Sequence, residues 1–261
     1  MGSSPWLLRP PADRRGQLRL FCFPYAGGGG SLYMSWAGEL APAVEVCAVQ
    51  LPGRENRLRE PAYTEFSKVV DATFLALRPC LDVPFALFGH SMGALVAFEL
   101  ARRLRAENAP APVRLFVSGY RAPQIRSRHA PFSHLPDAEF LAEVRARYDG
   151  VPEEVLRHAD LMALLLPCLR ADMTLIESFA WRDEAALTCP ISAYGGRNDP
   201  EAREPELAAW RTHTRGAFTL RLFSGTHFFI RSARSELVMA IARDLADATE
   251  STPGATLAQC P

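Results

Sequence analysis

The sequence predicts an α/β protein with a mostly parallel central sheet, flanking helices and one inserted helical segment. Short apolar runs rich in β-branched and aromatic residues alternate with stretches of helical periodicity over most of the 261 residues. That alternation is interrupted once, between residues 121 and 188, where the patterns are helical only. Hydrophobic residues make up 48% and charged residues 22%, which is typical of a globular chain with a large core.

The predicted elements follow one another in βα order on both sides of the insertion. The apolar runs predicted to be strands are 18–23, 44–51, 85–88, 113–118, 191–195 and 218–223. The segments predicted to be helices are 66–78, 94–104 and 235–248, with 140–148, 154–166 and 169–179 inside the insertion. Strands joined through helices pair in parallel and are covered on both faces, so we expect a buried parallel sheet.

The domain organisation follows from the same pass along the chain. Residues 17–120 and 189–250 are predicted to form the core, and residues 121–188 a helical lid, because structureless loops of that length are rare in compact domains. Residues 1–16 contain several Pro, Ser and Arg and are expected to form a flexible leader. The small, polar segment 251–261 is expected to be a disordered tail.

Charge and cysteine content exclude several classes of protein. The chain has 29 basic and 29 acidic side chains, whereas nucleic-acid binders usually carry a basic excess. No apolar run is long enough to span a bilayer, and no signal-peptide pattern is present, so a cytoplasmic location is expected. None of the six cysteines forms a metal-binding pattern with another cysteine or a histidine. We therefore expect no nucleic acid, membrane or metal partner.

The strongest chemical signal is Gly89-x-Ser91-x-Gly93 between a predicted strand and a predicted helix. A serine on such a sharp turn projects from the sheet edge, and the flanking glycines let strand and helix approach closely. The following helix N-terminus favours developing negative charge. The alternative is an ordinary strand-to-helix turn, because short glycine patterns recur by chance. In this context the motif predicts an α/β-hydrolase fold with Ser91 as nucleophile.

A serine nucleophile needs a base, and the base needs a carboxylate. In this fold the acid and then the histidine follow the serine along the chain. His227 comes directly after the last predicted strand and Asp199 after the one before it, so both are predicted partners of Ser91. His213 is interpreted as a surface histidine, and Asp183 precedes its strand and falls at the wrong end of the sheet. The alternative for Asp199 is a loop-capping aspartate.

Acyl transfer also needs hydrogen-bond donors for the oxyanion. In this fold one donor is the backbone N–H after the nucleophile, here Met92. The other comes from the loop after the first predicted core strand, where Ala26 is favoured and Tyr25 or Gly27 is the alternative. The adjacent glycine run lacks the Gly-Lys-Ser/Thr that a phosphate-binding loop requires, so that interpretation is poor.

Several short motifs occur together, in order, within residues 18–248. They are Phe23-Pro24-Tyr25-Ala26-Gly27-Gly28, Leu51-Pro52-Gly53-Arg54, Gly89-His90-Ser91-Met92-Gly93-Ala94, Gly195-x-x-x-Asp199 and Gly225-x-His227-Phe228-Phe229. This series resembles the type II thioesterases that accompany modular polyketide synthases and nonribosomal peptide synthetases. The free-standing thioesterase of animal fatty acid synthesis is similar. The resemblance implies hydrolysis of acyl thioesters, stalled or aberrant, on the phosphopantetheine arm of acyl or peptidyl carrier proteins.

The resemblance also leads to expectations about substrate and partner contacts. No cofactor is implied, because the pantetheine arm arrives with the substrate. The apolar residues expected to line an acyl slot are Tyr25, Phe228, Leu164, Leu165, Leu166, Met173 and Phe179, and simple lid core is the alternative. Arg121, Arg126 and Arg128 are candidates for meeting an acidic carrier protein or the phosphate, with a solvated charged face as the alternative.

Two other functions fit parts of the pattern. A carboxylesterase or lipase would use the same catalytic residues on oxygen esters, and only the family resemblance separates it from a thioesterase. A non-catalytic binding protein on a hydrolase scaffold is the second alternative, and the intact Ser91, Asp199 and His227 argue against it.

Overall fold

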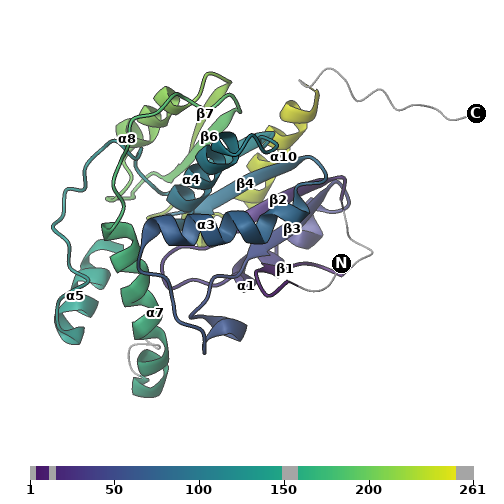
Figure 1. Cartoon of the computed structure of the whole chain (residues 1–261). Helices are drawn as coiled ribbons and strands as arrows, with labels where there is room; N and C mark the ends of the chain where they lie inside the picture. Colours follow the sequence, from purple (N-terminus) through teal and green to yellow (C-terminus); the bar gives the residue numbers. More distant parts are fainter. Residues whose placement is uncertain (1–3, 12–15, 149–157, 251–261) are drawn as a thin grey trace, which may run out of the picture.

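A seven-stranded sheet in the order β1-β3-β2-β4-β5-β6-β7 forms the centre of the protein (Figure 1). The computed structural model describes residues 4–11, 16–148 and 158–250. The strands are β1 Leu7–Leu8, β2 Leu18–Phe23, β3 Val44–Val49, β4 Phe85–His90, β5 Arg114–Ser118, β6 Ile191–Gly196 and β7 Phe218–Phe223. All neighbours pair in parallel except β1, which is antiparallel to β3. The predicted mostly parallel sheet is confirmed.

The six predicted strands are all present. β2 and β7 have the predicted bounds, and the other four differ at their ends by one or two residues. All residues of β2 to β6 are buried, which explains why their sequences are apolar runs rather than alternating patterns. β7 is an edge strand, and five of its six residues are only partly buried.

The flexible leader predicted for residues 1–16 is wrong for the part that contains β1. Leu7 pairs with Val49, and the Gln50 N–H donates to the Trp6 carbonyl at 2.8 Å. The Trp6 ring packs against the core and lies under the guanidinium of Arg57 at 4.5 Å. Packing of one tryptophan thus orders an edge strand too short to be seen in the hydrophobic pattern. Residues 1–3 and 12–15, and the predicted tail 251–261, lie outside the described residues.

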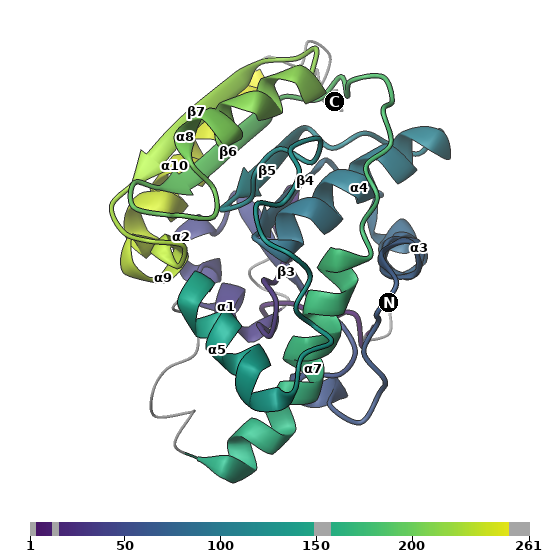
Figure 2. The ribbon, with the colours of Figure 1, turned by 90° about the vertical axis from the view of Figure 1, so that its left-hand side faces the viewer.

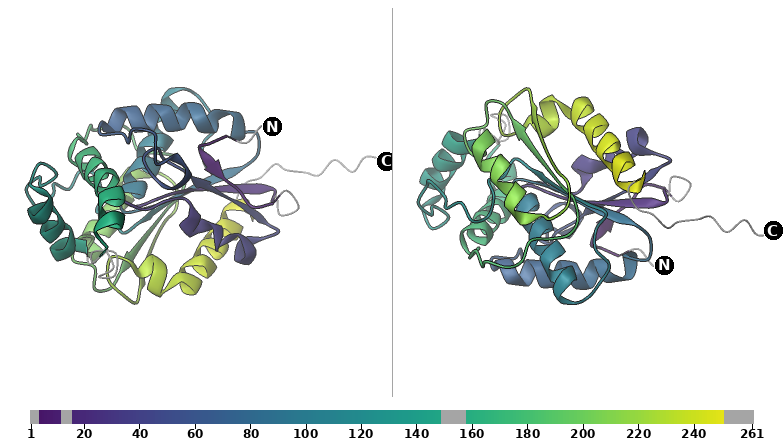
Figure 3. Two further views of the ribbon diagram at one scale, coloured as in Figure 1. Left: turned by 90° about the horizontal axis from the view of Figure 1, so that it is seen from below. Right: turned by 90° about the horizontal axis from the view of Figure 1, so that it is seen from above.

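Helices cover both faces of the sheet, and Figure 3 shows these layers from two sides. They are α1 Ser31–Met34, α2 Ala37–Leu40, α3 Phe66–Leu77, α4 Met92–Ala106, α5 Asp137–Tyr148, α7 Ala159–Glu177, α8 Glu204–Ala208, α9 Phe229–Ser232 and α10 Arg234–Glu250. The helices α3 and α4 form one apolar cluster with alternate strand residues, and α1, α2, α9 and α10 form a second with the others. Within the described residues no helix is long and apolar enough to cross a membrane.

Helices α5 and α7 lie side by side at one edge of the sheet, between β5 and β6 in the chain (Figure 2). They share a small apolar cluster that includes Phe140 and Val144 of α5 and Leu169 and Met173 of α7. The two helices predicted at 154–166 and 169–179 are wrong as separate elements, because α7 continues through Pro167. A proline removes one hydrogen bond from a helix, and packing of the turns on either side keeps this helix continuous. Residues 154–157 lie outside the described residues.

The contact between α4 and the strands beneath it leaves no room for a side chain at Gly93. A Cβ atom there would lie 2.3 Å from the Phe23 carbonyl oxygen, which belongs to the backbone and cannot rotate away. We expect Gly93→Ala to lower the free energy of unfolding by at least about 1–3 kcal/mol, the usual effect of overpacking. Urea denaturation followed by circular dichroism measures this.

Gly38→Ala is the matched control, because Gly38 is exposed on helix α2. Alanine is favoured over glycine inside a helix by about 0.5–1 kcal/mol, so this variant should be as stable as the wild type or more stable. A Gly93→Ala protein of unchanged stability would contradict the close approach of α4 and β2.

Candidate active site

Ser91 lies on a sharp turn between β4, which ends at His90, and α4, which begins at Met92. Its φ is 53° and its ψ is −120°, a backbone conformation that side-chain-bearing residues rarely adopt. The Ser91 N–H donates to the Ser118 carbonyl of the neighbouring strand at 2.7 Å, which supports this conformation. The strained turn predicted from the glycine pattern is therefore present, and it places the hydroxyl beyond the sheet edge.

His227 connects Ser91 to Asp199 through two hydrogen bonds. Its Nε2 lies 3.0 Å from Ser91 Oγ, and its Nδ1 lies 2.8 Å from Asp199 Oδ2. All three residues are buried, with between 2% and 6% of their surface exposed. A carboxylate at Nδ1 favours the tautomer that carries its proton there, which leaves the Nε2 lone pair directed at the serine hydroxyl. The three residues predicted from the sequence thus meet in the order that proton transfer requires.

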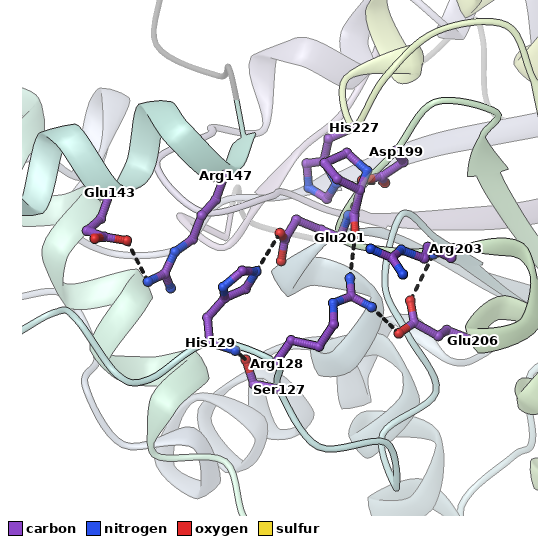
Figure 4. A network of polar contacts seen from close by, with 11 residues as sticks. Ser127, Arg128, His129, Glu143, Arg147, Asp199, Glu201, Arg203, Glu206 and His227 are labelled. Carbon is purple, nitrogen blue, oxygen red and sulfur yellow. Dashed lines mark hydrogen bonds and ion pairs between the residues drawn. The ribbon is translucent and has the colours of Figure 1, made fainter.

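The loop that carries Asp199 is attached to the lid segment by polar contacts (Figure 4). Asp199 Oδ1 accepts the Glu201 N–H at 2.9 Å, and Glu201 Oε1 lies 3.0 Å from His129 Nε2. Arg128 donates to the Glu206 carboxylate and to the Pro200 carbonyl. Arg128, a candidate for meeting a carrier protein, is therefore paired within the chain, although a third of its side chain is exposed (33%).

Two further histidines are buried, and burial keeps both neutral. His90 Nδ1 lies 2.9 Å from Ser118 Oγ, and loss of solvation lowers the pKa of His90 well below the usual 6.5. His213 contacts Gln124 Oε1 at 2.5 Å and packs against three aromatic rings. Burial lowers the pKa of His213 to about 4. The interpretation of His213 as a surface histidine is wrong, but it takes no part in the Ser91 site.

Backbone N–H groups converge on the same edge of the sheet. Met92 is the first residue of α4, so its N–H has no acceptor within the helix. The N–H of Gly27 donates to the Asp172 carboxylate at 2.7 Å, which removes Gly27 from the candidate oxyanion donors. No hydrogen bond among the described residues uses the Ala26 N–H. Ala26 and Met92, the favoured pair, thus remain candidate donors for an oxyanion, and so does the alternative Tyr25, whose N–H is likewise used by no hydrogen bond among the described residues.

An apolar cavity of about 250 Å³ opens beside Ser91. Tyr25, Leu165, Met173 and Phe228 line it, as expected for an acyl slot. The expectation for Phe179 is wrong, because its ring packs edge-on against Phe66 at 5.0 Å between centroids. Those for Leu164 and Leu166 are also wrong: Leu164 is 52% exposed, and Leu166 packs into the lid cluster.

Sequence reasoning missed several side chains of the cavity wall. They are Val144, Tyr148, Met162, Leu169 and Arg231. The spacing of Met162, Leu165, Leu169 and Met173 is that of one helix face, a signal that could have found two of them. Arg231 donates to the Tyr25 hydroxyl and lies 5.5 Å from the Phe228 ring centroid, so a charged group closes one side of the cavity. The described residues contain no cluster of metal-ligating side chains.

The fold and this hydrogen-bonded serine, histidine and aspartate define a hydrolase of the α/β-hydrolase class. Residues 18–247 match the family model of the thioesterase domain, and the chain belongs to this thioesterase family. It is therefore a hydrolase that acts on thioesters.

Several relatives of this chain belong to named biosynthetic pathways. It is 40% identical to the gramicidin S biosynthesis protein GrsT of Aneurinibacillus migulanus, over 92% of this chain and 93% of that protein. Its structure is similar to the RedJ thioesterase of the prodiginine pathway of Streptomyces coelicolor, with a TM-score of 0.83 and 38% identity over 90% and 88% of the two chains. It is also similar to the structure of the type II thioesterase BorB of the borrelidin cluster, with a TM-score of 0.84 and 37% identity over 94% of this chain and 99% of that chain. The resemblance to type II thioesterases is thus confirmed.

Replacement of Asp199 tests the role of the acid. Asp199→Asn keeps the size of the side chain but removes the charge that stabilises an imidazolium and selects the His227 tautomer. We expect kcat for thioester hydrolysis to fall by about 10⁴-fold, with the fold intact. Steady-state kinetics and circular dichroism measure the two effects. The control is Asp183→Asn on an exposed side chain, which should leave kcat unchanged; a similar loss in both variants would refute the assignment.

Proposed function

We propose that Ser91, His227 and Asp199 are the catalytic triad of a type II thioesterase that removes acyl groups from the phosphopantetheine arm of carrier proteins. The observation that carries this proposal is the buried chain of hydrogen bonds from Asp199 through His227 to Ser91, at the mouth of an apolar cavity. The relatives described above are named for the gramicidin S, prodiginine and borrelidin pathways, which supports stalled or aberrant acyl groups of such assembly lines as the substrates.

The proposed reaction has two halves. Ser91 Oγ attacks the thioester carbonyl carbon and its proton passes to His227 Nε2, while the carbonyl electron pair moves onto oxygen. The N–H groups of Ala26 and Met92 stabilise that oxyanion. When it collapses, the carbon–sulfur bond breaks and the pantetheine thiolate leaves with the proton from His227. Water, deprotonated by His227, then releases the acid and restores Ser91. Side chains and water suffice, so we expect no cofactor.

Acyl release from a loaded carrier protein tests this proposal. We expect wild-type protein to release acetyl, propionyl and longer groups from the carrier, and Ser91→Ala to reduce the rate by more than about 10³-fold, because the nucleophile is lost. Mass spectrometry of the intact carrier follows the loss of the acyl group. Matched oxygen esters of the same acyl groups test the alternative of a carboxylesterase. Turnover of those esters without release from the carrier would contradict the carrier-protein proposal.

A second cavity of about 480 Å³ adjoins the first, and Tyr148 and Met173 line both. The Tyr148 ring lies 5.1 Å from the His227 ring, between centroids, so this tyrosine forms part of the wall next to the reacting atoms. We infer that the wall limits the length of the acyl group. A longer chain needs the space beyond Tyr148.

Tyr148→Ala should therefore join the two cavities. We expect kcat/KM for octanoyl relative to propionyl carrier to rise at least about 10-fold, since each additional buried methylene contributes about 0.8 kcal/mol. Phe179→Ala is the control, because Phe179 lines the second cavity but not the first. Competition between the two acylated carriers in one mixture measures the ratio directly. An unchanged ratio in Tyr148→Ala would show that the tyrosine does not limit chain length.

A further inference from the structure

A buried ion pair joins the lid helix α7 to the loop after β3. Asp172 of α7 is 1% exposed and Arg54, in the loop after β3, is 5% exposed. Asp172 Oδ1 accepts from Arg54 Nη2 at 2.8 Å, and Oδ2 accepts from Nη1, also at 2.8 Å. Such a bidentate arginine–carboxylate contact is the strongest and most directional of the common ion pairs.

The same carboxylate holds the backbone of the candidate oxyanion loop. Asp172 Oδ2 accepts the Gly27 N–H at 2.7 Å, and Arg54 Nη1 also donates to the Gly28 carbonyl at 3.1 Å. The Gly28 N–H closes the turn by donating to the Tyr25 carbonyl at 2.9 Å. The Tyr25 carbonyl and the Ala26 N–H belong to one peptide, and the Gly27 N–H belongs to the next, so these bonds restrain the peptides on both sides of Ala26 and with them the direction of the Ala26 N–H.

We propose that Asp172, oriented by Arg54, is a positioning residue for the oxyanion hole. By holding the Gly27 backbone it keeps the Ala26 N–H directed at the oxyanion, and it makes this geometry depend on the position of α7. The proposal rests on the function proposed above, in which Ala26 donates to the oxyanion. Preorganised donors stabilise a transition state because they need not reorient when charge develops. Asp172 supplies that preorganisation by occupying the Gly27 N–H, which would otherwise be free to rotate with the loop.

The lid and the oxyanion loop cannot move independently under this arrangement. Displacement of α7 would leave the buried Arg54 charge and the Gly27 N–H without their acceptor, and an uncompensated buried charge is strongly destabilising. Leu169, one turn before Asp172 on α7, lines the acyl cavity and lies against Gly27. An acyl group packed on Leu169 therefore contacts α7 one turn before Asp172, which holds the loop that contains Gly27. Binding of the acyl group therefore favours the position of α7 in which this contact is made.

The first variant is Asp172→Asn, which keeps the shape of the side chain and weakens both contacts. We expect kcat to fall by about 10- to 100-fold, with KM within about threefold of the wild-type value. Removal of one preorganised donor lowers kcat by about 10²–10³-fold, and this variant only weakens the positioning of one donor. The control is Asp244→Asn on α10. Asp244 is equally buried (1% exposed) and accepts from Ser192 Oγ, Tyr194 Oη and Arg221, away from the Ser91 site. It should lower the thermal midpoint but leave kcat of the folded enzyme unchanged.

The second variant separates positioning from stability. Replacing both members of a buried ion pair by apolar residues of similar size often preserves stability. Arg54→Met/Asp172→Leu should therefore fold even if Asp172→Asn does not, and should still lose at least about 10-fold in kcat because Gly27 has no acceptor. If the stable double variant has wild-type kcat, the proposal is overturned.

Binding of two inhibitors provides a readout that a purely structural role would not move. A trifluoromethyl ketone analogue of acyl-pantetheine forms a tetrahedral adduct with Ser91 and places an oxyanion in the hole, whereas the thioether analogue has no carbonyl. Across the variants, we expect the Kd of the ketone to rise by the same factor as kcat falls, with the Kd of the thioether constant. Equal weakening of both inhibitors would overturn the proposal, since Asp172 would then act on substrate binding in general.

Wild-type protein in the same carrier assay distinguishes the two proposals. If wild type releases acyl groups and the Asp172 variants release them equally fast, the positioning role is refuted and the thioesterase function stands. If wild type does not release them, the proposed function itself fails, and the positioning proposal fails with it.

Discussion

The close contact between the start of α4 and the strands β2 and β4 is the constraint on which the rest of the site depends. A Cβ at Gly89 would lie 2.0 Å from the Gly93 carbonyl oxygen, and one at Gly93 would lie 2.3 Å from that of Phe23. Without this approach Ser91 could not occupy its strained turn. The contact also places the backbone of Phe23 and Pro24, which precede the proposed oxyanion loop, against the first turn of α4.

The parallel sheet does the remaining assembly. Ser91, Asp199 and His227 follow β4, β6 and β7, and the carboxyl ends of parallel strands meet at one edge. His227 and Ser91 are 136 residues apart in the chain, yet short loops from a rigid scaffold suffice to join them. Burial then sets the electrostatics. Loss of solvation lowers the pKa of a second buried histidine at this edge, His90, whose Nδ1 lies 2.9 Å from Ser118 Oγ.

Local patterns were enough to predict the strands and the meeting of Ser91, Asp199 and His227, because a buried parallel strand is an uninterrupted apolar run and each of these residues comes within a few residues after one. Features that depend on contacts distant in sequence were not predictable in this way. β1 is ordered by the packing of Trp6, and α7 remains helical across Pro167 because its neighbouring turns pack. Leu164 and Phe179 have the apolar character of cavity residues, but Leu164 lies on an exposed face of α7, and Phe179 follows the end of α7 and packs on Phe66.

The lid differs from a simple cover because its polar contacts reach both catalytic loops. Asp172 of α7 accepts the N–H of Gly27 in the loop after β2. His129 contacts the Glu201 carboxylate, and the Glu201 N–H donates to Asp199. These contacts differ in burial: the first is enclosed, whereas the side chain of His129 is 38% exposed. Solvent screens the exposed contact, so it adds little stability, while loss of the enclosed one leaves a charge uncompensated. Coupling between lid and chemistry is therefore expected to pass mainly through the oxyanion loop rather than through the acid.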